Sequence, residues 1–194
     1  ASAMQRSQIM YRIAEMLEGK RRELAEAIDA PRAAKRSGDE ATKGDDEVGA
    51  AIDRLVHYAG WCDKHQQVLG TNNPVAGPYY NFTIPEPTGV VAVVCSDDWV
   101  LLPLISLLAP ALCAGNTAVV IPSESNPIPA CIFAEACATG DLPPGVVNIL
   151  TGMREELVPH IATHRDINAV HAANLSAEHA RLLREGASEN LKRV

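Results

Sequence analysis

The sequence predicts an α/β protein in which a mostly parallel sheet carries helices on both faces, preceded by two helices and a hairpin segment. Three observations predict this class. The strand candidates are continuous apolar runs rather than alternating ones, segments of helical period separate them, and the connections are short. Aromatic residues are only 4% of the 194, so Ala, Val, Ile and Leu must build the core, as in buried parallel sheets.

Two helices come first. Apolar residues between 4 and 28 recur at helical spacing along one face, and those between 48 and 59 repeat the pattern. Residues 30–46 are rich in charge, Gly, Ser and Thr, and Pro31 opposes continuation of the first helix. We expect a surface helix, a linker or mobile loop, and a second helix that ends near Trp61.

A proline-rich segment follows the second helix. Its turn-forming residues flank the β-branched and aromatic stretch 79–84, and they are Pro74, Gly77, Pro78, Pro85 and Pro87. This arrangement predicts a hairpin-like edge within residues 70–88, not a central strand.

The remainder alternates strand and helix about four times. Buried strands are predicted at 89–95, 117–121, 146–150 and 167–172, helices at 101–114, 128–139, 155–162 and 176–186, and a last strand begins at 191. Such alternation implies right-handed crossovers, with ligands bound at the carboxyl ends of the strands. The chain therefore divides into N-terminal helices (1–66), a hairpin or edge segment (67–88) and an α/β domain (89–194).

Charge and cysteine usage restrict the partners and the compartment. The chain has 24 acidic and 17 basic residues, a net charge of −7, and a negative field disfavours nucleic acid. The N-terminus leads into an amphipathic helix, so no signal or membrane segment is expected. The five cysteines form no Cys-x-x-Cys pair, which fits a reducing interior. We expect a cytoplasmic protein that binds neither nucleic acid nor membrane.

The turn after the first buried strand bears on cofactor binding. A dinucleotide site needs a glycine-rich turn there, whereas residues 96–99 are Ser-Asp-Asp-Trp. A phosphate about 4 Å from a carboxylate costs about 4 kcal/mol at an effective dielectric constant of about 20. The simpler interpretation is that Asp97 or Asp98 caps the following helix.

The residue spacing predicts neither a metal site nor a nucleophile. His160 and His164 stand four residues apart, but Ile161 takes the place of a metalloprotease glutamate and no third ligand is evident. Burial in apolar strands and helices raises a thiol pKa and leaves it inert. We therefore assign core packing to the cysteines that fall in such segments, which are Cys95, Cys113, Cys131 and Cys137.

Several segments resemble one known family in order and spacing. They are 88–91 (Thr-Gly-Val-Val), 109–117 (Ala-Pro-Ala-Leu-Cys-Ala-Gly-Asn-Thr), 122–124 (Pro-Ser-Glu) and 142–152 (Leu-Pro-Pro-Gly-Val-Val-Asn-Ile-Leu-Thr-Gly). They resemble the cofactor-binding, N-terminal half of the aldehyde dehydrogenase superfamily. The resemblance is strong over the middle third of the chain and looser over nearly all of it, and it implies a Rossmann-like domain.

The resemblance also implies a degenerate cofactor site. Active members carry Pro-Trp-Asn where this chain has Ser96, Asp97 and Asp98. The asparagine helps to hold the oxyanion, and a carboxylate cannot donate that hydrogen bond.

Two further positions weaken the implied nucleotide site. The lysine of the family's Lys-Pro-Ser-Glu segment is Ile121 here, and the glycine and serine of its Phe-Thr-Gly-Ser segment are Asn174 and Leu175. A side chain at Asn174 stands where bare backbone is needed. The cofactor-binding positions that persist, as vestiges, are Ser123, Glu124 and Gly152.

In the family, the general base and the cysteine nucleophile follow the segment that matches 190–194 (Asn-Leu-Lys-Arg-Val), so we expect no catalytic residue in this chain. Degeneracy and this ending most resemble the non-catalytic second module of the long two-module family 16 aldehyde dehydrogenases. The resemblance implies a structural pseudoenzyme module with no cofactor or metal of its own. Its implied partners are a catalytic aldehyde dehydrogenase module or subunit and further copies of itself. Residues 77–87 are the candidate contact, because that region of the family builds an inter-subunit sheet.

Two alternatives stay open. In the first, the chain is the N-terminal fragment of an active NAD(P)-dependent aldehyde dehydrogenase, which oxidises an aldehyde to a carboxylic acid. In the second, the chain is a binding module that takes another nucleotide or a small acid at the strand ends. Substitutions at Asp98, Ile121 and Leu175 oppose the first alternative. The scarcity of convergent polar groups opposes the second.

Overall fold

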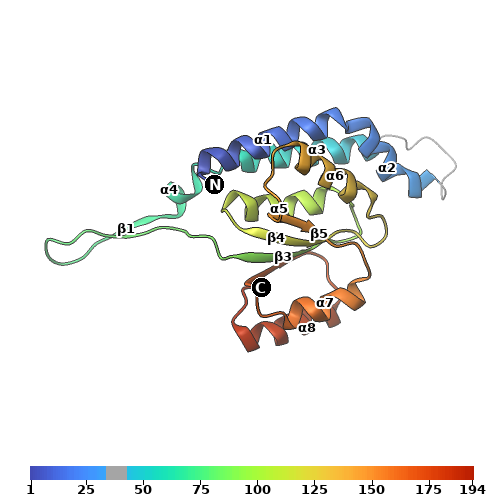
Figure 1. The fold of residues 1–194 in the computed structure, drawn as a ribbon. Coiled ribbons are helices and arrows are strands. Elements are labelled where there is room, and N and C mark those ends of the chain that lie inside the picture. The colour runs from blue at the N-terminus through green and yellow to red at the C-terminus, as the bar shows by residue number, and fades with distance from the viewer. Residues whose placement is uncertain (34–42) are drawn as a thin grey trace.

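A computed structural model describes residues 1–33 and 43–194, and it shows a layered α/β fold (Figure 1). Within these ranges the main sheet is parallel, with the strand order β5-β4-β3-β6. Its strands are β3 (Val90–Val94), β4 (Thr117–Ile121), β5 (Val147–Ile149) and β6 (Ala169–Ala172). The predicted fold class and the predicted parallel sheet are confirmed.

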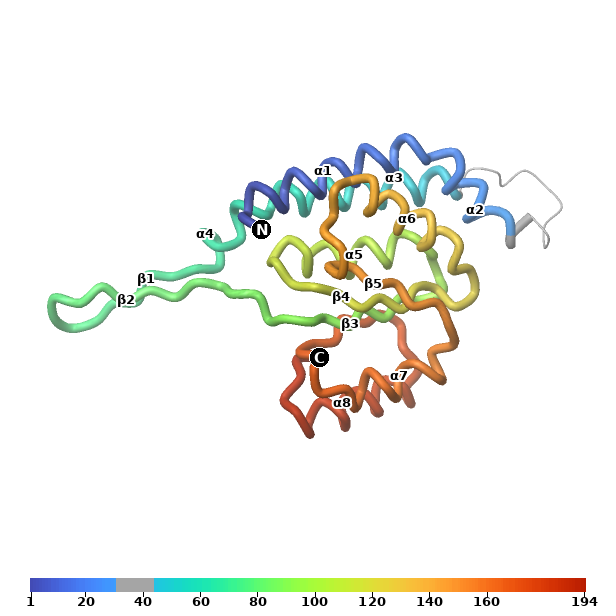
Figure 2. The backbone as a smooth tube through the Cα atoms, in the orientation of Figure 1, coloured from blue at the N-terminus to red at the C-terminus, as the bar shows by residue number. Residues whose placement is uncertain are grey.

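Helices cover both faces of this sheet (Figure 2). On one face lie α5 (Leu102–Cys113) and α6 (Ile128–Thr139), and on the other lie α7 (Arg154–Thr163) and α8 (Ala177–Asn190). Because successive side chains of a strand point to opposite faces, Val91 and Val93 join the core under α5 and α6, whereas Ala92 and Val94 join the core against α7 and α8. The central strand is buried on both faces, as its uninterrupted apolar run predicts.

A further helical layer packs over α5 and α6. It consists of α1 (Ala3–Gly19), α2 (Arg21–Ala33) and α3 (Lys43–Ala59). The prediction of one helix over 4–28 is wrong, because the chain breaks at Gly19 and Lys20 and restarts as α2. The apolar spacing continues through the break, so periodicity alone does not detect it.

The end of α2 also differs from the prediction. The helix continues through Pro31 to Ala33, although proline has no N–H for the carbonyl four residues earlier. That carbonyl, of Ala27, accepts a hydrogen bond from the Asn126 Nδ2 instead, at 2.9 Å. The predicted linker at 30–46 is therefore helical at both ends, and its residues 34–42 lie outside the described residues.

A long hairpin projects from the body of the molecule (Figure 1). A short helix, α4 (His65–Leu69), leads into β1 (Thr71–Asn73), which pairs antiparallel with β2 (Asn81–Thr83). The predicted hairpin edge is confirmed, whereas α4 is not predicted by the sequence pattern. We call residues 67–88 the arm.

The last residues make one isolated bridge at the edge of the sheet. Arg193 bridges to Ala169 in parallel, because its carbonyl accepts from the Val170 N–H at 2.7 Å and its N–H donates to the Asn168 carbonyl at 3.1 Å. The prediction of a strand starting near 191 is met only in part, because Arg193 makes a single bridge and residues 191–194 form no strand. Among the described helices, none combines the length and the apolar character that a membrane span requires.

Candidate functional site

The loops after the four parallel strands meet at one edge of the sheet, where ligands of such folds bind. Residues 96–98 follow β3, 122–126 follow β4, 150–153 follow β5 and 173–176 follow β6. We call this edge the crevice. Polar side chains from different loops bond to one another across it.

Asp97 is the centre of these contacts. Its Oδ1 accepts hydrogen bonds from the Ser123 Oγ at 2.7 Å and from the Ser125 N–H at 3.1 Å, and its Oδ2 pairs with the Arg154 Nη1. The Arg154 guanidinium, helped by these hydrogen bonds, holds the pKa of Asp97 well below its usual range. Asp97 therefore joins the ends of β3, β4 and β5 as a carboxylate.

Arg154 supplies the positive charge of the crevice. Its side chain is only 14% exposed, and the adjacent Asp97 raises the pKa of the guanidinium. Its backbone N–H, at the start of α7, donates to the Glu124 Oε2 at 2.9 Å. Within the part of the chain that the structure describes, the Nε and Nη2 of Arg154 are buried without a hydrogen-bond partner. Arg154 thus lies inside the crevice with its charge matched by Asp97.

Asp98 and Asn174 form a second bridge. The Asn174 Nδ2 donates to the Asp98 Oδ2 at 2.6 Å, which connects the loop after β3 to the loop after β6. Asn174 has a φ of 51°, in the left-handed region that asparagine tolerates better than most side chains. The side chain that replaces the family's glycine therefore reaches across the crevice.

Neither aspartate caps α5, so that interpretation is wrong. The cap comes from Glu47 on α3, whose Oε1 accepts from the N–H groups of Val100, Leu101 and Leu102 at 2.8, 2.7 and 3.1 Å. Glu47 is 1% exposed, and among the described residues its Oε2 has no hydrogen-bond partner. The negative end of this side chain matches the positive end of the α5 dipole.

The structure brings together two of the three sequence-predicted site residues. Ser123 and Glu124 both belong to the contacts around Asp97 and Arg154, whereas Gly152 lies in the turn before α7, where an added Cβ would meet the Leu157 Cδ1 at 3.1 Å.

Sequence reasoning missed Arg154, Ser125 and Glu47. Arg154 carried a usable signal, because a basic residue in the first turn of a helix opposes the helix dipole and calls for a separate explanation. Ser125 and Glu47 carried none.

Ile121 and Leu175, where the family resemblance implies a lysine and a serine, belong to the core or pack against it. Ile121 is buried with Val94 on the face covered by α7 and α8, and Leu175 packs against that cluster. An apolar environment of this kind has no place for a charged lysine at position 121.

The cysteines only partly follow the prediction. Burial raises the pKa values of Cys95 and Cys137 to about 12, as expected for inert core thiols. Cys131 is exposed on α6, so its assignment to the core is wrong. Cys113 is buried in the core as predicted, although the Cys62 thiol lowers its pKa. In the described ranges, no group of three or more His, Cys, Asp or Glu side chains could hold a metal ion.

The parallel sheet and the crevice define a Rossmann-like α/β protein of the nucleotide-binding type. The profile of the aldehyde dehydrogenase family matches residues 1–194. The chain belongs to the aldehyde dehydrogenase family.

Individual relatives agree with this assignment. Aldehyde dehydrogenase 1A1 of Gallus gallus is 35% identical over 195 residues, which is 99% of this chain and 36% of that protein. Retinal dehydrogenase 2 of Homo sapiens is 38% identical over 149 residues, which is 76% of this chain and 28% of that protein. The NAD+ complex of an aldehyde dehydrogenase from Bacillus cereus superposes with a TM-score of 0.87 at 28% identity, covering 100% of this chain and 38% of that one. The chain thus matches between 28% and 38% of the length of these relatives.

Proposed function

We propose that residues 1–194 form a structural, non-catalytic module of a larger aldehyde dehydrogenase, and that the module holds no NAD(P). One observation carries this proposal: the polar side chains at the strand ends are bonded to one another across the crevice. A dinucleotide that entered the crevice would have to displace these contacts.

Electrostatics support the proposal. The crevice contains the carboxylates of Asp97, Asp98 and Glu124, against one guanidinium that is already paired. Each carboxylate about 4 Å from a phosphate oxygen opposes binding by about 4 kcal/mol at an effective dielectric constant of about 20. The net charge of these four groups is negative, so a pyrophosphate is repelled rather than attracted.

Ser123 and Glu124, which match the family motif, make structural hydrogen bonds within the chain. Ser123 is 1% exposed and donates to Asp97, and Glu124 accepts from the first N–H of α7. Ser123 and Glu124 therefore stabilise the loops after β4 and β5 without any ligand. Folding contacts account for Ser123 and Glu124 at these positions. We assign Ser123, Glu124 and Gly152 as vestigial cofactor positions.

The parent protein that we propose is a two-module family 16 aldehyde dehydrogenase, in which this chain is the second, non-catalytic module. We propose that this parent lies in the cytoplasm. The partners of this chain would be a catalytic aldehyde dehydrogenase module or subunit and further copies of itself. The arm is the contact we assign to them. Tyr79 is 75% exposed and Tyr80 76%, and residues 66–85 contain no Asp, Glu, Lys or Arg.

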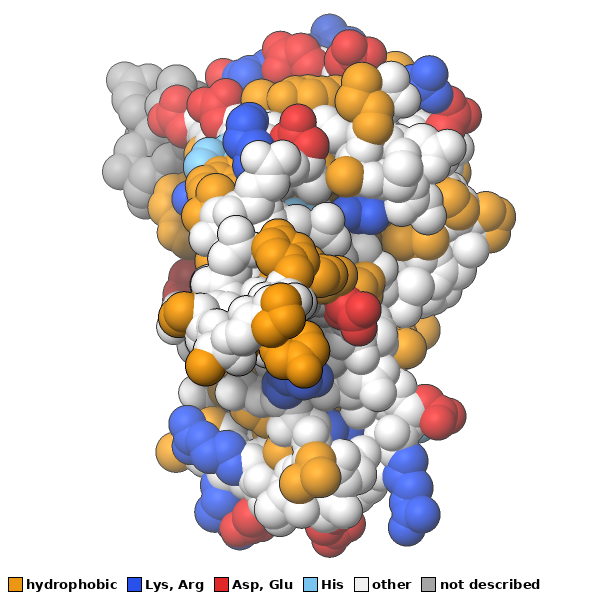
Figure 3. Space-filling model, turned by 90° about the vertical axis from the view of Figure 1, so that its left-hand side faces the viewer, with side chains coloured by type: hydrophobic (Ala, Val, Ile, Leu, Met, Phe, Trp, Pro, Cys, Tyr) orange, Lys and Arg blue, Asp and Glu red, His pale blue; other side chains and the backbone are white. Residues whose placement is uncertain are grey.

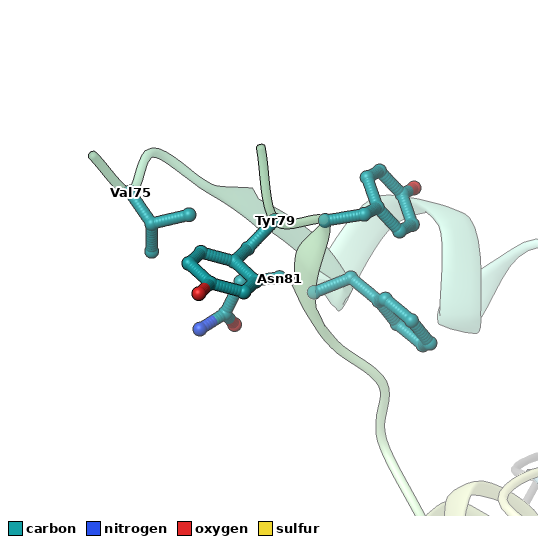
Figure 4. A pocket seen from close by; sticks show the side chains of 5 residues that line it. Val75, Tyr79 and Asn81 are labelled. Atoms are coloured by element: carbon teal, nitrogen blue, oxygen red, sulfur yellow. The ribbon is translucent and has the colours of Figure 1, made fainter. Parts of the chain in front are cut away.

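The tip of the arm has a shape that suits such a contact. Its hydrophobic side chains gather where the arm points toward the viewer in Figure 3. Val75, Tyr79 and Asn81 surround an open hollow of about 380 Å³ (Figure 4), which is also lined by Tyr80 and Phe82. An uncharged, aromatic surface of this kind gains free energy when a partner covers it.

Titration calorimetry with NAD and NADP tests the proposal. We expect no saturable heat from the wild-type chain, and a dissociation constant in the micromolar range would overturn the assignment. The variant Asp98→Asn with Asn174→Gly and Leu175→Ser restores the family pattern at three positions, and we expect it to gain measurable binding. Asp166→Asn, which removes an exposed carboxylate away from the crevice, is the matched control and should gain none.

A second function is favoured by the superposition on the NAD+ complex of the Bacillus cereus enzyme. In that case the chain is the N-terminal part of an active NAD(P)-dependent aldehyde dehydrogenase that converts an aldehyde to a carboxylic acid. The intact mass and reading frame of the source protein separate the two functions. One module with a downstream cysteine nucleophile supports the active enzyme, and two modules support the structural assignment.

A further inference from the structure

Hydrogen-bond donors from two parts of the chain converge on one point of the crevice. They are the Ser123 Oγ and the Ser125 N–H, in the loop after β4, and the Arg154 guanidinium, in the first turn of α7. The Ser123 Oγ is itself held by the Asn126 N–H, at 3.3 Å. A hydroxyl, a backbone N–H and a guanidinium together form a donor set suited to a small oxyanion. The crevice therefore contains the donors of an oxyanion site, and they all bond to the Asp97 carboxylate.

Asp97 fills this site without satisfying it. The residue belongs to the loop after β3, and its side chain is 37% exposed, so its place can be reached from solvent. Asp97 pairs with the Arg154 Nη1, while the Nε and Nη2 of that guanidinium are buried and have no hydrogen-bond partner among the described residues. A guanidinium binds a carboxylate best through two parallel hydrogen bonds. A free carboxylate can turn toward that geometry, whereas the Asp97 carboxylate is tethered to its loop.

The charge of the crevice selects among anions. Glu124 and Asp98 also place carboxylates there, held by the Arg154 N–H and the Asn174 Nδ2. A monocarboxylate that takes the place of Asp97 leaves the net charge of the crevice unchanged. A phosphate dianion adds one more negative charge beside Glu124 and Asp98, which repel it. The donors therefore suit a small monocarboxylate better than a phosphate.

We propose that the donors around Asp97 form a binding site for a small monocarboxylate, and that Asp97 occupies this site as an autoinhibitory internal ligand. The site deepens the proposed function and rests on it, because Asp97 is the group that keeps the wild-type crevice closed to ligands. An external carboxylate enters when the Asp97 side chain leaves. The exchange is non-covalent and replaces one carboxylate by another.

Chemical rescue of an Asp97 variant tests this site. Asp97→Gly removes a methylene and a carboxylate, which together have the size of acetate. We expect the variant to unfold at lower urea than the wild type, and acetate at about pH 7 and constant ionic strength to restore at least about half of the lost midpoint, in a saturable manner. Asp97→Ala removes the carboxylate alone, and formate should restore it in the same way. Addition of Arg154→Gln to Asp97→Gly should abolish the rescue.

Matched controls separate a binding site from a general salt effect. Acetamide has the shape of acetate without its charge and should restore nothing, and phosphate should restore less than acetate. Asp98→Gly removes the neighbouring carboxylate, which accepts from the uncharged Asn174, and acetate should leave its midpoint unchanged. The wild-type chain should not respond to acetate either, since Asp97 fills the site.

The outcomes are decisive in both directions. The proposal is overturned if acetate and acetamide restore Asp97→Gly equally, or if Asp98→Gly responds to acetate as strongly as Asp97→Gly. If neither Asp97 variant folds alone, the refolding yield in acetate or formate, compared with acetamide, decides instead. Saturable NAD binding by the wild-type chain would overturn the proposed function whether or not acetate rescues the variants, so the two failures are distinguishable.

Discussion

Replacement of Glu47 by alanine tests whether one buried carboxylate on α3 holds the start of α5. Its Oε1 accepts three backbone N–H groups, from Val100, Leu101 and Leu102. A hydrogen bond to a charged acceptor contributes about 1.5–3 kcal/mol, but three bonds to one oxygen are not additive. Removal of Glu47 leaves buried N–H donors at the start of α5 without a partner, and each unsatisfied buried donor costs about 1–3 kcal/mol.

An opposing effect reduces this cost. The Glu47 Oε2 is buried with no hydrogen-bond partner among the described residues, so its deletion also removes a desolvation penalty. We expect Glu47→Ala to lower the free energy of unfolding by about 3 kcal/mol, because three N–H donors lose their acceptor while one desolvation penalty disappears. Glu47→Gln keeps an acceptor oxygen but loses the charge, and we expect about 1–2 kcal/mol.

Equilibrium urea unfolding, followed by circular dichroism, measures these values from the midpoint at constant slope. Asp46→Ala is the control, because Asp46 is an exposed acidic neighbour on the same helix and should change stability by less than about 0.5 kcal/mol. If Glu47→Ala and Asp46→Ala differ by less than about 1 kcal/mol, the carboxylate does not hold α5 and the reasoning is refuted.

Two further predictions concern the crevice and the helix packing. Because its partners depress the folded-state pKa of Asp97, Asp97 stabilises the fold above its unfolded pKa of about 3.9, and this stabilisation is lost as the pH falls from there toward the lower folded value. Acid unfolding curves should therefore be steeper below about pH 4 for the wild type than for Asp97→Asn, and equal slopes would contradict the paired carboxylate. Gly186→Ala should destabilise the fold by about 2 kcal/mol or more, because the new Cβ would overlap the Ala162 carbonyl oxygen. The control Gly19→Ala meets nothing within 4 Å and should stabilise the fold by about 0.5–1 kcal/mol in the same urea unfolding measurement. Equal effects of the two alanines would show that α7 and α8 are not in close contact at Gly186.

Most of the fold could be predicted from the sequence, because the apolar periodicity repeats many times within each long element. The α6 helix starts and ends where the pattern predicts, and β3 and β4 differ by no more than one residue at each end. The end of α1 at Gly19 could not be predicted, since the same apolar helical face continues on both sides of it. Short elements such as α4 contain too few residues for a period to be recognised.

The side chains of the crevice could be predicted from the sequence only in part. The residue types at Asp98, Ile121, Asn174 and Leu175, set against the family resemblance, led to the prediction of an altered cofactor site, because charge, size and backbone requirements are properties of single residues. The hydrogen-bond and ion-pair partners of the crevice residues could not be predicted from the sequence. Asp97 was assigned to a local helix cap, yet it pairs with Arg154, 57 residues later in the chain.

The amino-acid sequence by itself determined the α/β class, the order of its strands and helices, and the residue types at the strand ends. The tertiary structure alone decided that Glu47 caps α5, that Arg154 neutralises Asp97 and that Asn174 bonds to Asp98. The physical reason is that secondary structure follows from patterns repeated over neighbouring residues, whereas each of these contacts is a single pair. Only the path of the chain through the sheet and its helices brings such a pair within hydrogen-bonding distance.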